Sequence, residues 1–350
     1  MAYHGDVLPE IVVHADWSVD PRKRWVCRAT LNHDRTYQIV KPAPAGDLDV
    51  FFRHLVVAAG EAGRILAGFD FPLGLPAAYA DQVGIDDFRK ALVEFGHGVW
   101  REFYEVAATA QEVSLFRPFF PLRPGGKGAY ARSQLAAGLG VHHFDDLQRQ
   151  VDRPTSCRPA ASVMFWTLGS KQVGKAAIVG WRDLLAPALA ATDIGLAMWP
   201  FDGTLQECMA AERITVAEAY PAEYYRHLDL PLVRGGSKRR QQSRIASGGR
   251  LIEWAAVAGV RLDDALQCAL REGFGVRPDG EDPFDAVVGT CGILNVVLGL
   301  RPPFDPDKRS IRKVEGWTLG QAPPGHEEGN TSPRDQYFDR PGAVSKGPVD

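Results

Sequence analysis

The sequence contains no apolar run close to the roughly 20 residues that a helix needs to span a bilayer, which predicts a protein that does not interact with a membrane. Residues 1–6 show no basic region followed by an apolar core, so we expect no secretory signal. Cysteine is scarce as well: five cysteines are scattered over 350 residues without a Cys-x-x-Cys pair. This pattern argues against a disulfide framework and a zinc site. We therefore expect a reduced, cytoplasmic protein.

Neither sign of charge dominates the chain, because 40 Lys and Arg residues face 43 Asp and Glu residues, for a net charge of -3. This balance neither demands nor excludes a nucleic-acid partner, since a local basic patch can act on a near-neutral protein. The sequence also contains no internal repeat. What it does contain is apolar residues, 45% of the total, which are enough to build the core of one large domain.

The first 70 residues predict an α/β pattern in which two apolar strands are each followed by an aspartate. A hairpin is expected around Asn32-His33-Asp34, because β-rich runs flank these turn residues. The predicted elements are strands at 11–15, 24–31, 35–40 and 65–69 and a helix at 47–62. Asp16 follows the first of these strands and Asp70 follows the last.

Residues 71–192 differ in character, and we interpret them as a large, mainly helical insertion. Helices are expected at 86–107 and 175–190, separated by a loop at 117–128. The earlier pattern resumes with strands at 194–199 and 214–218, followed by helices at 238–258, 262–272 and 283–298. Residues 322–350 are rich in Pro, Gly, Asp and Ser and predict a disordered tail. The expected organisation is one domain over 8–321 that contains the insertion.

Five acidic residues stand where an α/β fold gathers functional groups. Asp16, Asp70 and Glu218 end apolar strands, and strand ends meet at a crevice in such sheets. Asp282 and Asp285 stand three residues apart at the start of a predicted helix and can face the same way. Carboxylates that lie this close repel one another unless a cation bridges them or a proton neutralises one. Hard oxygen ligands of this kind favour Mg²⁺ or Mn²⁺.

Each of these acids also has a purely structural interpretation. Asp282, followed by Pro283, is a good helix N-cap. Asp16 and Asp70 could each start a turn, and Glu218 is ambiguous because Glu223 lies close by. The ordered set, more than any single acid, favours a functional site.

Three segments resemble the signature blocks of domain-of-unknown-function family 429, which is grouped with predicted nucleases of the ribonuclease-H-like superfamily. They are AGFDFPLGLP at 67–76, AEAYP at 217–221 and DPFDA at 282–286. A basic stretch at 237–244 resembles the Lys/Arg-rich helix start that this family carries before its final acidic helix. The resemblance covers roughly residues 10 to 320.

The resemblance implies a ribonuclease-H-like mixed sheet flanked by helices. The superfamily carries one acid on its first strand, one at the end of its fourth and one or two on its last helix. Asp16, Asp70 and Asp285 match these places and are the implied metal ligands, with Asp282 beside Asp285. Glu218 is an additional position that is carried over more weakly.

Basic residues could hold the phosphate groups of a substrate. The candidates are Lys238, Arg239, Arg240, Arg244 and Lys175. The alternative for the first four is the solvated start of a helix. A second group, Arg117, Arg123, Lys127 and Arg132, lies among aromatic residues that could either stack a single strand or anchor the insertion.

The leading hypothesis is a metal-dependent nuclease or phosphodiesterase that acts on a nucleic acid or a nucleotide. Two Mg²⁺ or Mn²⁺ ions would be held by Asp16, Asp70 and Asp285, with Asp282 or Glu218 assisting. One alternative is an ATPase or sugar-kinase-like protein, because Asp16-Trp17-Ser18 has a faint likeness to the first phosphate loop of that group. Another is a non-catalytic binding module whose acids are structural caps.

Overall fold

The computed structural model describes residues 7–123, 128–154, 159–168, 173–276 and 278–324. Its centre is a seven-stranded mixed sheet with the strand order β5-β6-β4-β1-β2-β3-β7. The strands are β1 (Ile11–Asp16), β2 (Trp25–Leu31), β3 (Tyr37–Pro44), β4 (Ile65–Phe69), β5 (Leu196–Met198), β6 (Ile214–Glu218) and β7 (Arg261–Leu262). The α/β class, the hairpin β2–β3 and the four further predicted strands are confirmed; among the described strands only β7 was not expected.

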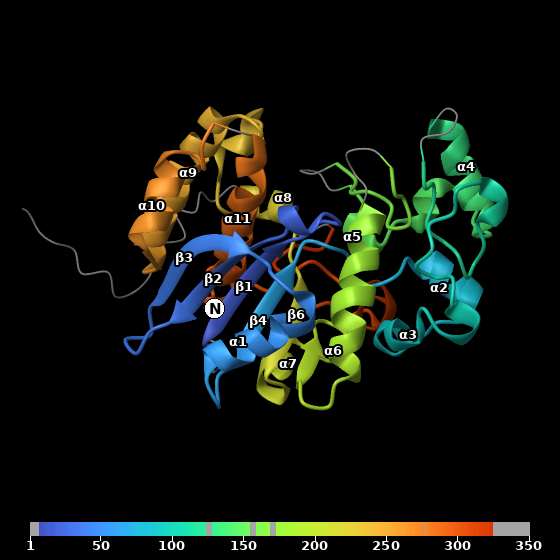
Figure 1. Ribbon diagram of the computed structural model, residues 1–350, viewed down its shortest axis with the longest axis horizontal. Coiled ribbons are helices and arrows are strands. Elements are labelled where there is room, and N and C mark those ends of the chain that lie inside the picture. The colour runs from blue at the N-terminus through green and yellow to red at the C-terminus, as the bar shows by residue number, and fades with distance from the viewer. Residues whose placement is uncertain (1–6, 124–127, 155–158, 169–172, 277, 325–350) are drawn as a thin grey trace, which may run out of the picture.

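The central strand β1 is buried along its whole length because helices cover both faces of the sheet (Figure 1). Successive side chains of a strand point to opposite faces, so Val13 packs into the core on one side and Val12 into the core on the other. On the Val12 side lie α9 (Gln241–Ala258), α10 (Asp264–Arg271) and α11 (Glu281–Val297). On the Val13 side lies α1 (Phe51–Ala59) together with residues of the insertion.

Helix α11 lies unusually close to the sheet, and glycines make this possible. A Cβ atom on Gly289 would stand 2.1 Å from the His14 ring in β1, and one on Gly292 would stand 2.2 Å from the Tyr224 ring. Two non-bonded carbon atoms cannot approach each other this closely, so only glycine fits at these two positions. Asp285 precedes Gly289 by about one helical turn. The close approach therefore also sets how near Asp285 comes to β1.

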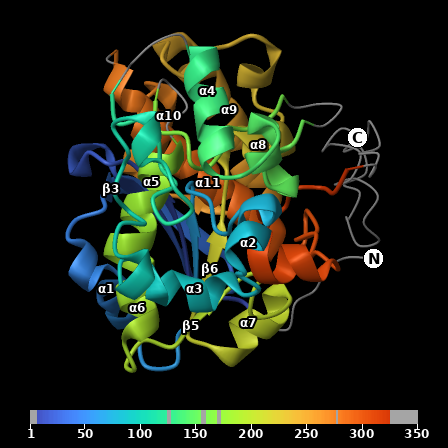
Figure 2. The ribbon, with the colours of Figure 1, turned by 90° about the vertical axis from the view of Figure 1, so that its right-hand side faces the viewer.

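The described part of the segment 71–192 contains short helices (Figure 2). These are α2 (Ala77–Val83), α3 (Phe88–Glu94), α4 (Gly128–Gly138), α5 (Val173–Val179) and α6 (Ala186–Ala190). The prediction of helix at 175–190 is confirmed, with a π-helical stretch at Gly180–Leu185 that joins α5 to α6. Buried aromatic residues of this segment belong to the same core as the Val13 face of the sheet.

The prediction of one long helix at 86–107 is wrong. Helix α3 ends at Glu94, and Gly96 and Gly98 follow with φ angles of +90° and +52°. This left-handed backbone ends a helix and turns the chain. The turn brings Phe103 back onto Phe95, with ring centroids 3.7 Å apart. Aromatic residues of the predicted helix therefore form a compact cluster instead of one helical face.

Three further differences concern the last third of the chain. Helices α7 (Leu205–Ala211) and α8 (Pro221–His227) were not predicted, and α9 begins at Gln241, so Lys238 lies in the preceding turn. Asp282 is not an N-cap, because α11 starts at Glu281 after Gly280 and no side chain caps it.

No described helix is long and apolar enough to cross a membrane. The predicted tail lies, from residue 325 onward, outside the described residues.

The substitution Gly289→Ala tests the close approach of α11. Its methyl group would overlap the His14 ring, and overpacking of this kind costs about 1–3 kcal/mol. We expect a loss of that size in the free energy of unfolding, measured by urea denaturation. Gly249→Ala in α9 is the matched control, since its Cβ would meet nothing within 4 Å and alanine favours a helix by up to about 1 kcal/mol. Equal stability of the two variants would contradict this account of α11.

Candidate carboxylate site

Asp16 and Asp70 stand side by side because of strand register. β1 and β4 are parallel, with Ala15 opposite Phe69, and each aspartate is the next residue along. The Asp70 Oδ1 atom accepts a hydrogen bond of 2.6 Å from the backbone N–H of Trp17, which lies just beyond β1. This bond joins the ends of two neighbouring strands, so Asp70 does more than cap the turn that follows it.

Asp285 brings a third carboxylate to the same place from α11. Its side chain is only 3% exposed. One oxygen accepts a hydrogen bond from the Tyr225 hydroxyl, and the other binds the Lys238 ammonium group. Because Lys238 lies in the turn before α9 and Tyr225 lies in α8, three separate segments hold this carboxylate in position.

The three acids share one electrostatic environment. Burial raises the pKa of Asp16 well above its usual value, and the nearby carboxylates of Asp70 and Asp285 raise it further. Burial also raises the pKa of Asp70 to about 7, although the Trp17 hydrogen bond partly opposes this. Lys238 lowers the pKa of both aspartates, and its own pKa is raised mainly by Asp285 against the cost of burial. One lysine thus partly compensates a cluster of acids that are costly to ionise together.

Asp282 lies at the edge of this cluster. Burial raises its pKa to about 6, and the neighbouring Glu281 carboxylate contributes, whereas Lys238 and Lys23 oppose the shift. Glu281 itself is paired with Arg239 at 3.7 Å. The Asp285 carboxylate also contributes to the raised pKa of Asp282, which is consistent with the prediction that the two acids face the same site. Asp285 is the more deeply buried of the two.

Glu218 is held differently, although β6 pairs with β4 and its Cα lies opposite Phe69. Its carboxylate accepts hydrogen bonds of 2.6 and 2.8 Å from the guanidinium of Arg149, which is 1% exposed. It also accepts one of 2.7 Å from the Leu73 N–H and one of 3.1 Å from the Thr318 hydroxyl. Arg149 binds Asp152 as well, at 2.8 and 3.0 Å. With its oxygens engaged in this way, Glu218 serves as an anchor for the insertion.

The predicted basic residues separate into three groups. Lys238 binds Asp285 and so belongs to the carboxylate cluster. Arg244 is fully buried, and its guanidinium donates to the carbonyl groups of Lys238, Gly273 and Gly275 at 2.6–2.7 Å. It therefore cannot contact a phosphate, and the prediction for this residue is wrong. Arg239 and Arg240 are exposed.

The aromatic residues of the insertion serve mainly as anchors. Phe119 and Phe120 are buried in the core, and Arg117 pairs with Glu112 at 3.0 Å. Arg132 lies over the rings of Phe144 and Trp166. Lys127 is outside the described residues. Phe116 and Tyr130, by contrast, are exposed, so the buried rings support the anchoring interpretation and the stacking alternative rests on these two residues.

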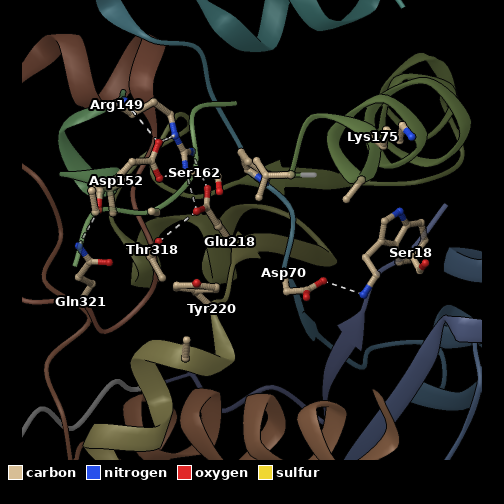
Figure 3. A pocket seen from close by; sticks show the side chains of 18 of the residues that line it. Ser18, Asp70, Arg149, Asp152, Ser162, Lys175, Glu218, Tyr220, Thr318 and Gln321 are labelled. Atoms are coloured by element: carbon tan, nitrogen blue, oxygen red, sulfur yellow. Dashed lines mark hydrogen bonds and ion pairs between the residues drawn. The ribbon is translucent and has the colours of Figure 1, made fainter. Parts of the chain in front are cut away.

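A cavity of about 910 Å³ opens beside the carboxylate cluster (Figure 3). Asp70 and Trp17 line it from the ends of β4 and β1, Glu218 and Arg149 line another part, and Lys175 lines it from α5. Tyr225, the hydrogen-bond donor to Asp285, also lies in its wall. Lys175, which the sequence predicts as a phosphate-binding residue, thus lies in the same cavity wall as Asp70.

Three important residues were not singled out from the sequence. Arg149 lies in the insertion and carries no motif, and Tyr225 follows β6 by seven residues without a recognisable spacing. Tyr220 lies within the segment AEAYP at 217–221, so the sequence resemblance included it without indicating its place in the cavity wall.

Within the described residues, no group of three or more His, Cys, Asp or Glu side chains is arranged to hold a metal ion. The contacts of Asp285 give a physical reason, because Tyr225 and Lys238 already engage its two oxygens. Metal binding by all three acids therefore requires the Lys238 ammonium group to move away.

Searches against protein-family models, curated proteins and solved structures return no match for this chain. The resemblance to family 429 thus stays a prediction that rests on the sequence segments.

The Arg149 network predicts a large stability effect. Arg149→Met would leave the Glu218 and Asp152 carboxylates without their cation in a buried place, and breaking a buried ion pair from one side costs about 3–5 kcal/mol. We expect a decrease of this size in the free energy of unfolding. Arg22→Met, which breaks an exposed pair with Asp20, should leave stability nearly unchanged. If both variants denature at the same urea concentration as the wild type, the Arg149 network does not stabilise the fold.

The raised pKa of Asp70 predicts a pH dependence of stability. Its ordinary value of 3.8 rises to about 7 in the folded protein, so between these values the folded state holds a proton that the unfolded state has released. The free energy of unfolding should therefore fall as pH rises from about 4 to 7 in the absence of divalent ions. Asp70→Asn should flatten this slope, whereas Asp81→Asn at an exposed position should not. A slope that Asp70→Asn leaves unchanged would contradict the assignment.

Proposed function

We propose that the protein is a metal-dependent hydrolase of phosphodiester bonds, of the nuclease or phosphodiesterase type, with Asp16, Asp70 and Asp285 as ligands of Mg²⁺ or Mn²⁺. The observation that carries the proposal is the convergence of three carboxylates, from β1, the end of β4 and α11, around the single ammonium group of Lys238.

The chemistry of these residues fits a hard divalent cation. Carboxylate oxygens are the preferred ligands of Mg²⁺ and Mn²⁺. Burial, together with neighbouring carboxylates, raises the pKa values of Asp16 and Asp70, so the ionised form of both acids is disfavoured in the present arrangement. A bound divalent ion would supply that charge and favour the ionised form of both acids. When bound, such ions provide a nucleophilic water at neutral pH and stabilise the leaving oxygen of a phosphodiester.

The placement of the acids also supports a ribonuclease-H-like fold. That superfamily carries acids on its first strand, at the end of its fourth strand and on its last helix. Asp16 is the last residue of β1, Asp70 follows β4 directly, and Asp285 lies in the first turns of α11. Asp282 is the candidate for an assisting acid, because it is partly exposed beside the cluster. Glu218 is not proposed to act in the reaction, since Arg149 neutralises it.

The two alternatives make different use of the same features. A kinase-like ATPase of this superfamily has a duplicated core, whereas the described residues form one sheet. A binding module with structural acids would need each acid to be paired or capping. Asp16 does not fit that requirement well, because its pKa is raised by two further carboxylates, Asp70 and Asp285, and the side chain with which it shares a hydrogen bond is itself an acid, Asp70. A phosphodiesterase accounts for the cluster with the fewest additional assumptions.

Asparagine substitutions at Asp16 and Asp285 test the proposal. Each keeps the size of the side chain and removes the negative charge, so we expect Mn²⁺-dependent hydrolysis to fall below detection in both variants while the circular dichroism spectrum is unchanged. The substrates are fluorescent single-stranded DNA and RNA and the chromogenic diester bis(4-nitrophenyl) phosphate. Asp81→Asn is the control with wild-type turnover. Hydrolysis that persists in both site variants, or that is absent from the wild type on all three substrates with either metal, would refute the proposal.

A further inference from the structure

The size of the cavity beside Asp70 limits what can reach the acids from that side. Its volume is about 910 Å³, within the range of roughly 300–1,000 Å³ that is typical of sites for small molecules. A cavity of this volume encloses a molecule the size of one nucleotide. It is too small for a duplex, which would have to lie outside it.

Two lysines in the cavity wall are available to bind an anion. Lys23 ends the 3-10 turn Pro21–Lys23 after β1, and Lys175 lies in α5 on the insertion. Neither forms an ion pair with another described residue. Several other charged side chains of the wall form ion pairs: Arg149 binds Glu218 and Asp152, and Asp20 binds Arg22. The two ammonium groups are therefore cations in the wall that no ion pair of the described residues engages, and lysine is a common partner of phosphate groups.

An aromatic ring lines another part of the same cavity. Tyr220 lies two residues beyond the end of β6 and is 36% exposed. It is one of the residues that line the pocket (Figure 3). Every nucleobase has a flat face that stacks on such a ring without requiring a particular sequence. The wall thus combines lysines for a phosphate group with an aromatic side chain for a base, next to an aspartate of the proposed metal site.

We propose that this cavity binds one nucleotide unit at a time, with its phosphate group against Lys23 and Lys175 and its base against Tyr220. The unit is either a free nucleoside monophosphate or the unpaired terminal nucleotide of a strand, and the two share the same recognition chemistry. The inference rests on the proposed function, because it names the class of substrate for that site. It predicts that the protein acts on small phosphodiesters or on single-stranded ends and not within a duplex.

Isothermal titration calorimetry with adenosine 5′-monophosphate tests the proposal, since this probe has no diester bond to hydrolyse. It is run with and without Mg²⁺ on the wild type and on three variants, Lys23→Met, Lys175→Met and Tyr220→Ala. We expect each variant to weaken binding about tenfold, which corresponds to about 1.4 kcal/mol. Tyr220→Ala should weaken adenosine binding too and leave inorganic phosphate unaffected, whereas the lysine variants should do the reverse. Lys90→Met is the control at an exposed position in α3, and Lys175→Arg should retain binding.

Competition distinguishes the sources of the nucleotide. A 5′-phosphorylated single-stranded hexanucleotide that displaces the monophosphate would identify strand ends as ligands, and a strand that does not would identify free nucleotides. The inference would be overturned if a blunt duplex of the same length displaced the monophosphate as effectively as the single strand does. It would also be overturned if the three variants bound the monophosphate as tightly as Lys90→Met. These binding readouts do not depend on hydrolysis. If the variants lose nucleotide binding but the wild type hydrolyses no substrate, the proposed function alone is refuted. If the wild type shows hydrolysis that depends on Asp16 but does not bind the monophosphate, this inference alone is refuted.

Discussion

The parallel pairing of β1 with β4 is the constraint on which the rest of the site depends. Its register places Ala15 opposite Phe69, so the next residue of each strand is an aspartate at the same edge of the sheet. Both strands are buried on two faces, which prevents either from slipping by one residue without turning its apolar side chains to the wrong side. Packing of the apolar core thereby keeps two carboxylates close together although they repel each other. The free energy gained by burying the apolar side chains offsets this repulsion.

A second constraint is the distance between α11 and the sheet. Gly289 and Gly292 let this helix approach the rings of His14 and Tyr224, and the approach carries Asp285 to the other two acids. The negative charge of Glu218 and that of the three-aspartate cluster are compensated to very different degrees. Glu218 is fully engaged by Arg149 and by neutral donors, whereas three acids share the ammonium group of Lys238. The first arrangement stabilises a fold, and the second is suited to binding an added cation.

The sequence predicts those parts of the site that are encoded locally. An apolar run that ends in an aspartate can be recognised without knowing its neighbours, and for this reason Asp16 and Asp70 were correctly placed at strand ends. Long-range pairing has no such local signal. Arg149 binds Glu218 across 69 residues of chain, and the burial of Arg244 depends on carbonyl groups up to 31 residues away. The single helix predicted at 86–107 is interrupted in the folded chain, where Gly96 and Gly98 turn the backbone.

The central claim is that Asp16, Asp70 and Asp285 together bind a divalent cation, and the most direct test is the free Mn²⁺ signal in electron paramagnetic resonance. Metal-free protein is titrated with Mn²⁺, and the loss of the free-ion signal measures binding. The account predicts saturable binding of one or two ions by the wild type, a large loss of affinity in Asp16→Asn and in Asp285→Asn, and full binding by Asp81→Asn. Wild-type protein that leaves the Mn²⁺ signal unchanged, or site variants that bind as tightly as the wild type, would contradict it.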